Sequence, residues 1–250
     1  MGTPTSPHKV TADDVLKWLS DPGLNEEEKA YLAYHRARLA FLLNLVAEQV
    51  ATLEKKGSGA VRILDVGPHF LTAALRYQYG RQIVLNTLGR ANERLAPQEV
   101  VDRHFEFDLN DAQSSFRWLP GEPHDLIVMG EVIEHVYTSP RLVLSFLRTF
   151  LRDNGVLIIQ TPNAVSLAKR LKMALGRQPY EMIRETRENP GHFREYTADE
   201  LKRLCQNVSL RCERVSYTDY WPSPWILKRI AAVCPPLRSG VTVIARNMST

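Results

Sequence analysis

The sequence predicts an α/β fold with a mostly parallel sheet, helices on both of its faces, and additional N-terminal helices. Short apolar runs alternate with helical stretches through the centre of the chain, which is typical of parallel strands joined by crossover helices. The 250 residues are 44% hydrophobic and 24% charged, enough for one large domain with a buried core. We therefore expect a disordered N-terminus and helical cap over 1–57 and an α/β domain over 58–250.

Two helices are expected before the sheet. Thr11 is followed three residues later by Asp14, a variant of the capping box, and the short helix that begins there stops at Asp21. A longer helix is predicted over 25–56, because three Glu residues at its start suit the helix dipole and a Gly-Ser-Gly run follows it. The residues before Thr11 are rich in Thr, Pro and Ser and are predicted to be disordered.

The strands and later helices follow in order. Five apolar runs predict strands at 61–66, 82–86, 104–108, 124–129 and 155–160, with helices at 71–79 and 140–151 between some of them. The segment 164–197 is expected to form a lid that contains a basic helix, and a capping-box pattern at Thr197 begins a further helix. Two C-terminal strands are expected at 211–218 and 241–246.

The segment 225–233 predicts a short, basic, amphipathic helix between those two strands. We expect it to pack on the protein's own sheet, because its apolar face is only two to three turns long; a membrane surface or a dimer partner are the alternatives. The basic stretch 169–172 is interpreted as a solvated face, or as a contact for an acidic or polymeric substrate.

Composition excludes several classes of protein. The 32 Lys and Arg residues exceed the 28 Asp and Glu residues by only four, which does not favour a nucleic-acid partner. Three cysteines without zinc-type spacing predict neither a disulfide framework nor a metal knuckle. The longest apolar stretch, 40–47, is too short to span a membrane, and no leader pattern opens the chain. We expect a soluble, cytoplasmic protein, with a homodimer left open.

Polar residues and glycines at the strand ends suggest a cofactor site. The Leu-Asp-Val-Gly run after strand one, Phe-Asp-Leu after strand three and Gly-Glu after strand four resemble the class I S-adenosylmethionine-dependent methyltransferases over about 60–250. This resemblance implies a Rossmann-like, seven-stranded sheet with one antiparallel strand. It also implies that the cofactor is bound by Asp65, Gly67, Asn86, Asp108, Leu109 and Gly130.

Two positions depart from that family pattern. Pro68 and His69 replace a second glycine, and Asn86 stands where an acidic residue usually binds the ribose hydroxyls, although an amide can still bond one of them. The three-glycine spacing of a dinucleotide site is absent, so a pyrophosphate ligand is not expected. A protein of this fold that binds the cofactor without catalysis is therefore an alternative.

The most informative pattern is the run from Glu131 to His135, directly after strand four. On a helix, Glu131, Glu134 and His135 would project on one side, and His192, after the expected lid, is a candidate fourth ligand. We interpret these four residues as a divalent-metal site, with Glu134, His135 and His192 also the catalytic candidates. The alternatives are a solvated helix face with a loop-capping His192, or a histidine acting as a metal-free general base.

This pattern, with its distant second histidine, resembles the metal site of small-RNA terminal 2′-O-methyltransferases, and in part that of ubiquinone-pathway catechol O-methyltransferases. That resemblance implies a Mg²⁺ or Mn²⁺ ion that grips two adjacent oxygens of the acceptor and lowers a hydroxyl pKa. The segments 160–163 and 189–196 are similar to the sugar O-methyltransferases of methylated mannose polysaccharide synthesis. They imply a sugar or oligosaccharide acceptor, such as the 1-hydroxyl of a mannoside, with an RNA-terminal ribose as the alternative.

Overall fold

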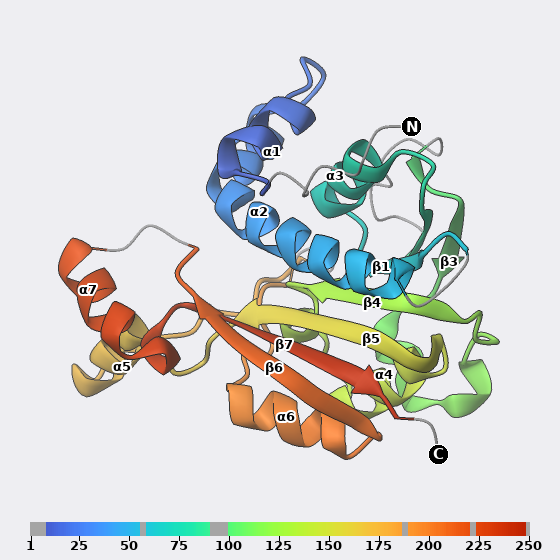
Figure 1. Cartoon of the computed structure of the whole chain (residues 1–250). Coiled ribbons are helices and arrows are strands. Elements are labelled where there is room, and N and C mark those ends of the chain that lie inside the picture. Colours follow the sequence, from blue (N-terminus) through green and yellow to red (C-terminus); the bar gives the residue numbers. More distant parts are fainter. Residues whose placement is uncertain (1–8, 56–58, 91–99, 187–189, 221–223, 249–250) are drawn as a thin grey trace.

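The computed structural model describes residues 9–55, 59–90, 100–186, 190–220 and 224–248, and Figure 1 shows their arrangement. One seven-stranded sheet has the order β3-β2-β1-β4-β5-β7-β6. Neighbouring strands from β3 to β5 are parallel, and β7 runs antiparallel to both β5 and β6. The predicted fold class, including the antiparallel strand near the end of the chain, is therefore confirmed.

The strands are β1 (Arg62–Val66), β2 (Val84–Gly89), β3 (Arg103–Glu106), β4 (His124–Gly130), β5 (Leu151–Pro162), β6 (Leu210–Thr218) and β7 (Gly240–Asn247). The second strand differs from the expected 82–86, because it starts later and continues to Gly89. Thr87 and Leu88, which are both buried, pair with Asp65 and Val66 of β1 and extend the strand. Asn86 therefore lies inside β2 and not at its end.

The α-helices are α1 (Ala12–Leu19), α2 (Glu26–Glu54), α3 (Phe70–Tyr79), α4 (Pro140–Arg148), α5 (Leu167–Ala174), α6 (Ala198–Gln206) and α7 (Trp225–Val233). Short 3₁₀ turns lie at η2 (Leu109–Gln113), η3 (Ser115–Arg117), η4 (Ile133–His135) and η5 (Pro235–Leu237). The N-caps predicted for α1 and α6, and Asn25 at the start of α2, are all capping boxes. No helix in the described ranges is both long and apolar enough to cross a membrane.

Two hydrophobic cores cover the two faces of the sheet. Helices α1, α2 and α3 pack on one face, and α4 and α6 pack on the other, as Figure 1 shows. Adjacent strand residues alternate between the cores: Ile63 belongs to the α2 side and Leu64 to the α4 side. The N-terminal helices expected as a cap are thus part of the main core, while residues 1–8 of the predicted disordered segment lie outside the described ranges.

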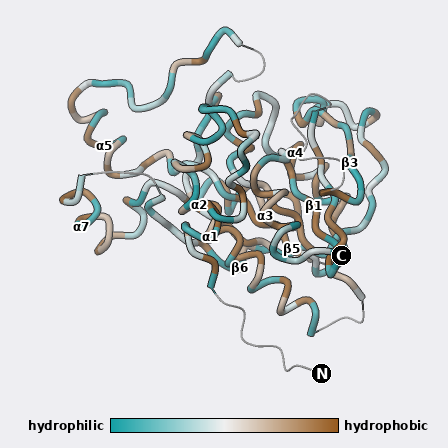
Figure 2. Tube along the Cα trace, turned by 90° about the horizontal axis from the view of Figure 1, so that it is seen from above, coloured by the Kyte–Doolittle hydropathy of each residue, from teal (hydrophilic) through white to brown (hydrophobic). Residues whose placement is uncertain are grey.

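Helix α7 does not follow the expectation that it packs on the sheet. It contacts η5 and α5, and Ala231 is its one buried residue. Figures 1 and 2 both show α5 and α7 beside each other at the side of the molecule, away from the layered centre. The apolar residues of α7 therefore remain largely exposed, because a helix at this position has no sheet face to cover.

Candidate active site

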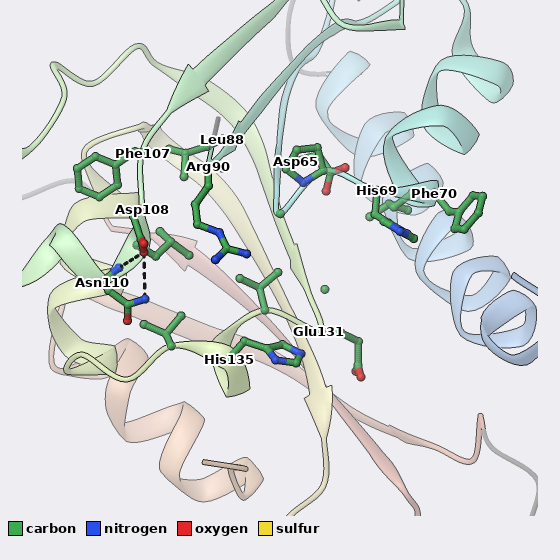
Figure 3. Close-up of a pocket in the computed structure, with 18 of the residues that line it drawn as sticks. Asp65, His69, Phe70, Leu88, Arg90, Phe107, Asp108, Asn110, Glu131 and His135 are labelled. Atoms are coloured by element: carbon green, nitrogen blue, oxygen red, sulfur yellow. Dashed lines mark hydrogen bonds between the residues drawn. The ribbon is translucent and has the colours of Figure 1, made fainter. Parts of the chain in front are cut away.

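A pocket of about 440 Å³ opens at the carboxyl ends of β1, β2 and β4, the edge where ligands bind in sheets of this kind. Figure 3 shows Asp65 and Asp108 on opposite sides of this pocket, Arg90 extending between them, and His135 and Glu131 along another edge. Among the expected cofactor residues, those lining the pocket are Asp65, Gly67, Asp108, Leu109 and Gly130. The volume is in the range of small-molecule sites.

Two glycines leave room where side chains would intrude. Gly67 has a φ of 74°, and a Cβ there would lie 2.6 Å from a methyl carbon of Val132. A Cβ on Gly130 would lie 2.9 Å from Leu42 of α2. Only glycine fits the backbone and the space at Gly67, so the turn after β1 keeps its close approach to the pocket.

The two aspartates of the pocket are held by neighbouring hydrogen bonds. The buried Asp65 accepts a bond of 2.7 Å from the Thr72 hydroxyl of α3, which fixes the orientation of its carboxylate. Asp108 is the N-cap of η2 and accepts bonds from the backbone and side-chain nitrogens of Asn110. Both carboxylates are thereby positioned before any ligand arrives, in agreement with a cofactor-binding role.

Asn86 is the one expected cofactor residue that the structure does not bring to the pocket. Its side-chain amide donates a 2.9 Å hydrogen bond to Nε2 of His124, at the opposite end of β4. The cause is the extension of β2, which places Asn86 in mid-strand and brings Gly89 and Arg90 to the pocket. Residues 91–99, which follow Arg90, lie outside the described ranges.

Sequence reasoning missed the contribution of α2 to this pocket. Tyr31 and Arg38 line it, and Arg38 is only 4% exposed although it carries a charge. The Arg38 guanidinium donates to the side-chain oxygens of Gln160 and Tyr31, at 3.2 and 3.3 Å. No salt bridge to a carboxylate within the described ranges accompanies it. The sequence signal for this role was an arginine among the apolar positions of a long helix, because arginine is rarely buried without a functional or structural partner.

The chain after β4 forms a 3₁₀ turn and not the expected helix. Glu131 has a φ of 57°, and η4 then carries Glu134 and His135. Glu131 therefore does not have the helical spacing that would align its side chain with those of Glu134 and His135. Glu131 lines the pocket, whereas Glu134 is fully buried beneath it and accepts a 2.9 Å hydrogen bond from the Thr161 hydroxyl.

Three of the four expected metal ligands meet. One potential ligand atom from each of Glu134, His135 and His192 lies within 4.8 Å of the other two. Two hydrogen bonds join the distant segments: the Phe193 amide donates to the Glu134 carbonyl at 2.8 Å, and the side-chain Nδ1 of His135 donates to the Gly191 carbonyl at 2.8 Å. His192 is thus fixed beside η4 across a long stretch of chain. Glu131 is not a member of this group.

Both imidazoles are arranged as neutral ligands. Nδ1 of His135 bonds Gly191, and Nδ1 of His192 donates to Glu195 at 3.2 Å, so each ring leaves Nε2 for another partner. Burial lowers the pKa of His135, and burial together with His135 lowers the pKa of His192 to about 4. Neutral histidines with one engaged nitrogen are what a metal ion requires.

The two carboxyl groups are buried with incomplete hydrogen bonding. Oε1 of Glu131 and Oε1 of Glu134 have no hydrogen-bond partner among the described residues. Burial raises the pKa of Glu131 to about 7, and burial together with the charge of Glu131 raises the pKa of Glu134 well above its ordinary value. An unpaired buried carboxylate oxygen is costly, so Glu134, the acid of the ligand group, fits a divalent-metal site.

Lys169 and Glu195 extend this cluster, and neither was expected from the sequence. The Lys169 ammonium bonds Glu195, which also accepts from His192. Burial lowers the pKa of Lys169 to about 8, so the expected solvated face at 169–172 is not solvated at its first residue. Glu195 positions the His192 ring. In the sequence, this role was indicated only by the location of Glu195 three residues after His192.

Comparisons with known proteins identify the family of this chain. A family described as a methyltransferase domain matches residues 31–215, more than half of the chain. Probable S-adenosylmethionine-dependent methyltransferases of two Mycobacterium tuberculosis strains are 35% identical over 112 residues. The match covers 45% of this chain and 36% of the relatives, so well under half the length of those relatives is matched.

Solved structures show the same fold. An S-adenosylmethionine-dependent methyltransferase from Archaeoglobus fulgidus has a TM-score of 0.51 and 16% identity, over 81% of this chain and 93% of that one. A putative methyltransferase from Haloferax volcanii, in complex with the Trm112 activator, has a TM-score of 0.54 and 10% identity, over 82% and 89%. The chain therefore belongs to the methyltransferase domain family and has a class I methyltransferase fold.

Proposed function

We propose that this protein methylates a hydroxyl oxygen of a sugar or oligosaccharide, with a divalent cation bound by Glu134, His135 and His192. The observation that carries the proposal is the grouping of these three residues within 4.8 Å, next to a pocket that shares His135 with them. The sequence resemblance of the segments 160–163 and 189–196 to sugar O-methyltransferases supports the acceptor class.

The pocket residues would hold the two reactants in line. When bound, S-adenosylmethionine supplies a methyl group on a positively charged sulfur, and a divalent cation supplies a Lewis acid that lowers the pKa of an acceptor hydroxyl. Gly67 and Gly130 keep side chains out of the pocket, and the fixed carboxylates of Asp65 and Asp108 orient the cofactor. Orientation of this kind supplies much of the rate increase in a two-substrate transfer.

Glu131 supports proton removal in this proposal. The new carbon–oxygen bond forms as the carbon–sulfur bond breaks, and the hydroxyl proton must leave to a base. The Glu131 carboxyl lines the pocket, is not in the ligand group, and has a pKa raised by burial to about 7. A carboxylate with a pKa near the working pH is well matched to that role.

Two exposed tyrosines, Tyr137 and Tyr180, are available for a sugar ring. Tyr180 is partly exposed, and its hydroxyl donates to the Ala164 carbonyl at 3.2 Å. Tyr196 and Tyr220 are buried, and Trp225 is on α7. Trp221 lies outside the described ranges. Tyr137, which lines the pocket, and Tyr180 are therefore the candidates for stacking on a pyranose.

The test is a methyl-transfer assay with mannosides, oligosaccharides and a short single-stranded RNA as acceptors. We expect methylation of a sugar hydroxyl, loss of activity in a chelator, and recovery with Mg²⁺ or Mn²⁺. Glu134→Gln and His192→Ala should lower the rate roughly a hundredfold or more, whereas His104→Ala, on β3, should not. Full activity in the chelator and in both variants would exclude the metal role, and methylation of RNA alone would exclude the sugar.

A further inference from the structure

The exposed apolar side chains of this protein are concentrated on one surface, formed by α5, its following residue Leu175, and α7. Figures 1 and 2 show the two helices beside each other, and contacts join them. We name this the α5–α7 surface. Its exposed apolar members are Leu171, Met173, Leu175, Trp225, Ile226, Ile230 and Val233.

These large apolar side chains are unusually exposed to solvent. Leu175, Trp225 and Val233 are 71%, 66% and 85% exposed, and α5 has no buried residue at all. Seven of the fifteen large apolar side chains that are exposed in the described ranges lie here, so the exposure is local. Exposed apolar side chains gathered on two helices that contact each other indicate an interaction site.

The two segments that carry this surface contain basic residues but no acidic ones. Residues 164–180 and 224–238 contain seven Lys and Arg residues and not a single Asp or Glu. Arg170 and Lys172 lie on α5, and Lys228 and Arg229 lie on α7. Lys169 is paired with Glu195, whereas these four form no salt bridge with another described residue. The surface therefore presents apolar groups among cations, and its partner must be anionic.

We propose that the α5–α7 surface docks on a membrane of anionic phospholipids. Basic, amphipathic helices bind such membranes by inserting apolar side chains while their Lys and Arg residues meet the lipid phosphates. Trp225 suits the interface, because an indole ring is apolar with one polar edge. A two-fold contact between copies of the chain would place like charges against each other, so charge complementarity favours the anionic lipid surface.

This docking would place the active-site cluster near the membrane. Helix α5 carries Lys169, which bonds Glu195, and Glu195 accepts from His192. The Tyr180 hydroxyl, in the segment after α5, bonds the Ala164 carbonyl. The proposal concerns a surface outside the catalytic pocket and does not depend on which hydroxyl is methylated.

The experiment is flotation of the full chain with vesicles of phosphatidylcholine alone or with phosphatidylglycerol added. We expect binding only to the anionic vesicles, and weaker binding at high salt. Leu175→Ser, Trp225→Ser and Val233→Ser should each lower the partition coefficient, and together by roughly tenfold or more. Phe116→Ser, which removes a side chain 86% exposed outside this surface, is the matched control and should bind as the wild type does.

The role of positive charge in vesicle binding is tested with a triple variant of the surface, which combines Lys172→Gln, Lys228→Gln and Arg229→Gln. The control is a triple variant outside the surface, which combines Lys9→Gln, Lys17→Gln and Lys55→Gln. The first triple variant should lose binding to anionic vesicles, and the second should keep it. Absence of vesicle binding, equal binding to neutral vesicles, or equal losses in surface and control variants would overturn the proposal. Self-association by sedimentation that Trp225→Ser abolishes, without vesicle binding, would identify a second copy as the occupant. Retention by polyglutamate alone would identify an acidic polymer.

Discussion

The two halves of the active site differ in how their polar groups are satisfied. On the cofactor side, the carboxylate of Asp65 accepts from Thr72 and that of Asp108 accepts from Asn110. On the side of η4, Glu131 and Glu134 each keep a buried oxygen without a hydrogen-bond partner in the described ranges. The carboxylates of the first half therefore have hydrogen-bond partners within the protein, while each acid of the second half keeps a buried oxygen without one in the described ranges.

This difference predicts two kinds of sensitivity. The cofactor half depends on backbone shape, because its carboxylates are already oriented and its glycines leave room for the ligand. The η4 half depends on charge, because two buried acids and two neutral histidines have been brought together at an energetic cost. Substitutions in the first half should affect cofactor binding, and those in the second should affect cation binding and stability.

The largest effect is expected for Gly67→Ala. The new methyl group would meet Val132 at 2.6 Å, at a backbone φ of 74° that alanine adopts with strain. Affinity for S-adenosylmethionine, measured by calorimetry, should fall about a hundredfold or more, equivalent to about 3 kcal/mol. Gly176→Ala is the control, because its φ is 69° but no atom lies within 4 Å of the new methyl. Equal losses in both variants would show that strain alone, and not the contact, is responsible.

The next prediction concerns the pH dependence of stability in the metal-free protein. Because burial raises the pKa of Glu131 from 4.5 to about 7, the folded state binds more protons than the unfolded state between these values. The wild type should lose on the order of 2 kcal/mol relative to Glu131→Gln as pH rises from 5 to 8, and a divalent cation should oppose this loss. Urea unfolding in a chelator measures it, and a difference independent of pH would contradict it.

A smaller effect is expected for Glu195→Gln, which weakens the partner that orients His192. Partners of ligating histidines contribute to metal affinity, so Mn²⁺ should bind about tenfold more weakly, a change of about 1.4 kcal/mol. S-adenosylmethionine affinity should not change, because Glu195 does not line the pocket. Glu185→Gln, at an exposed position, is the control. Loss of cofactor affinity together with metal affinity would indicate general disruption.

The smallest effect on the site is expected for Asn86→Ala. This substitution removes the hydrogen bond to His124 and should destabilise the fold by about 1 kcal/mol in urea unfolding. Cofactor affinity should stay within about twofold of the wild type, since the side chain faces away from the pocket. A tenfold loss of affinity with unchanged stability would return Asn86 to the cofactor site.

Sequence reasoning predicted the sheet, its helices and the meeting of His192 with Glu134 and His135, because strand ends in a parallel sheet converge at one edge. It placed Asn86 incorrectly, since strand ends are set by pairing with neighbours, and Thr87 and Leu88 pair with β1. It also expected a helix after β4, where Glu131 has a positive φ that side chains rarely adopt. The metal role itself stays a prediction.

Other features depend on contacts between distant segments and have no local signal. Arg38 of α2 reaches Gln160 of β5, and Glu195 joins Lys169 to His192. The position of α7 was also misjudged, because periodicity shows that a helix has an apolar face but not what covers it. Tertiary packing placed α7 against α5.

The most direct test of the cation site is a Mn²⁺ titration of the metal-stripped full chain, followed by electron paramagnetic resonance. The wild type should bind one ion tightly, and His192→Ala and Glu134→Gln should each lose that binding while retaining affinity for S-adenosylmethionine. Identical Mn²⁺ binding in all three proteins, or no binding in the wild type, would contradict the assignment of Glu134, His135 and His192 as its ligands.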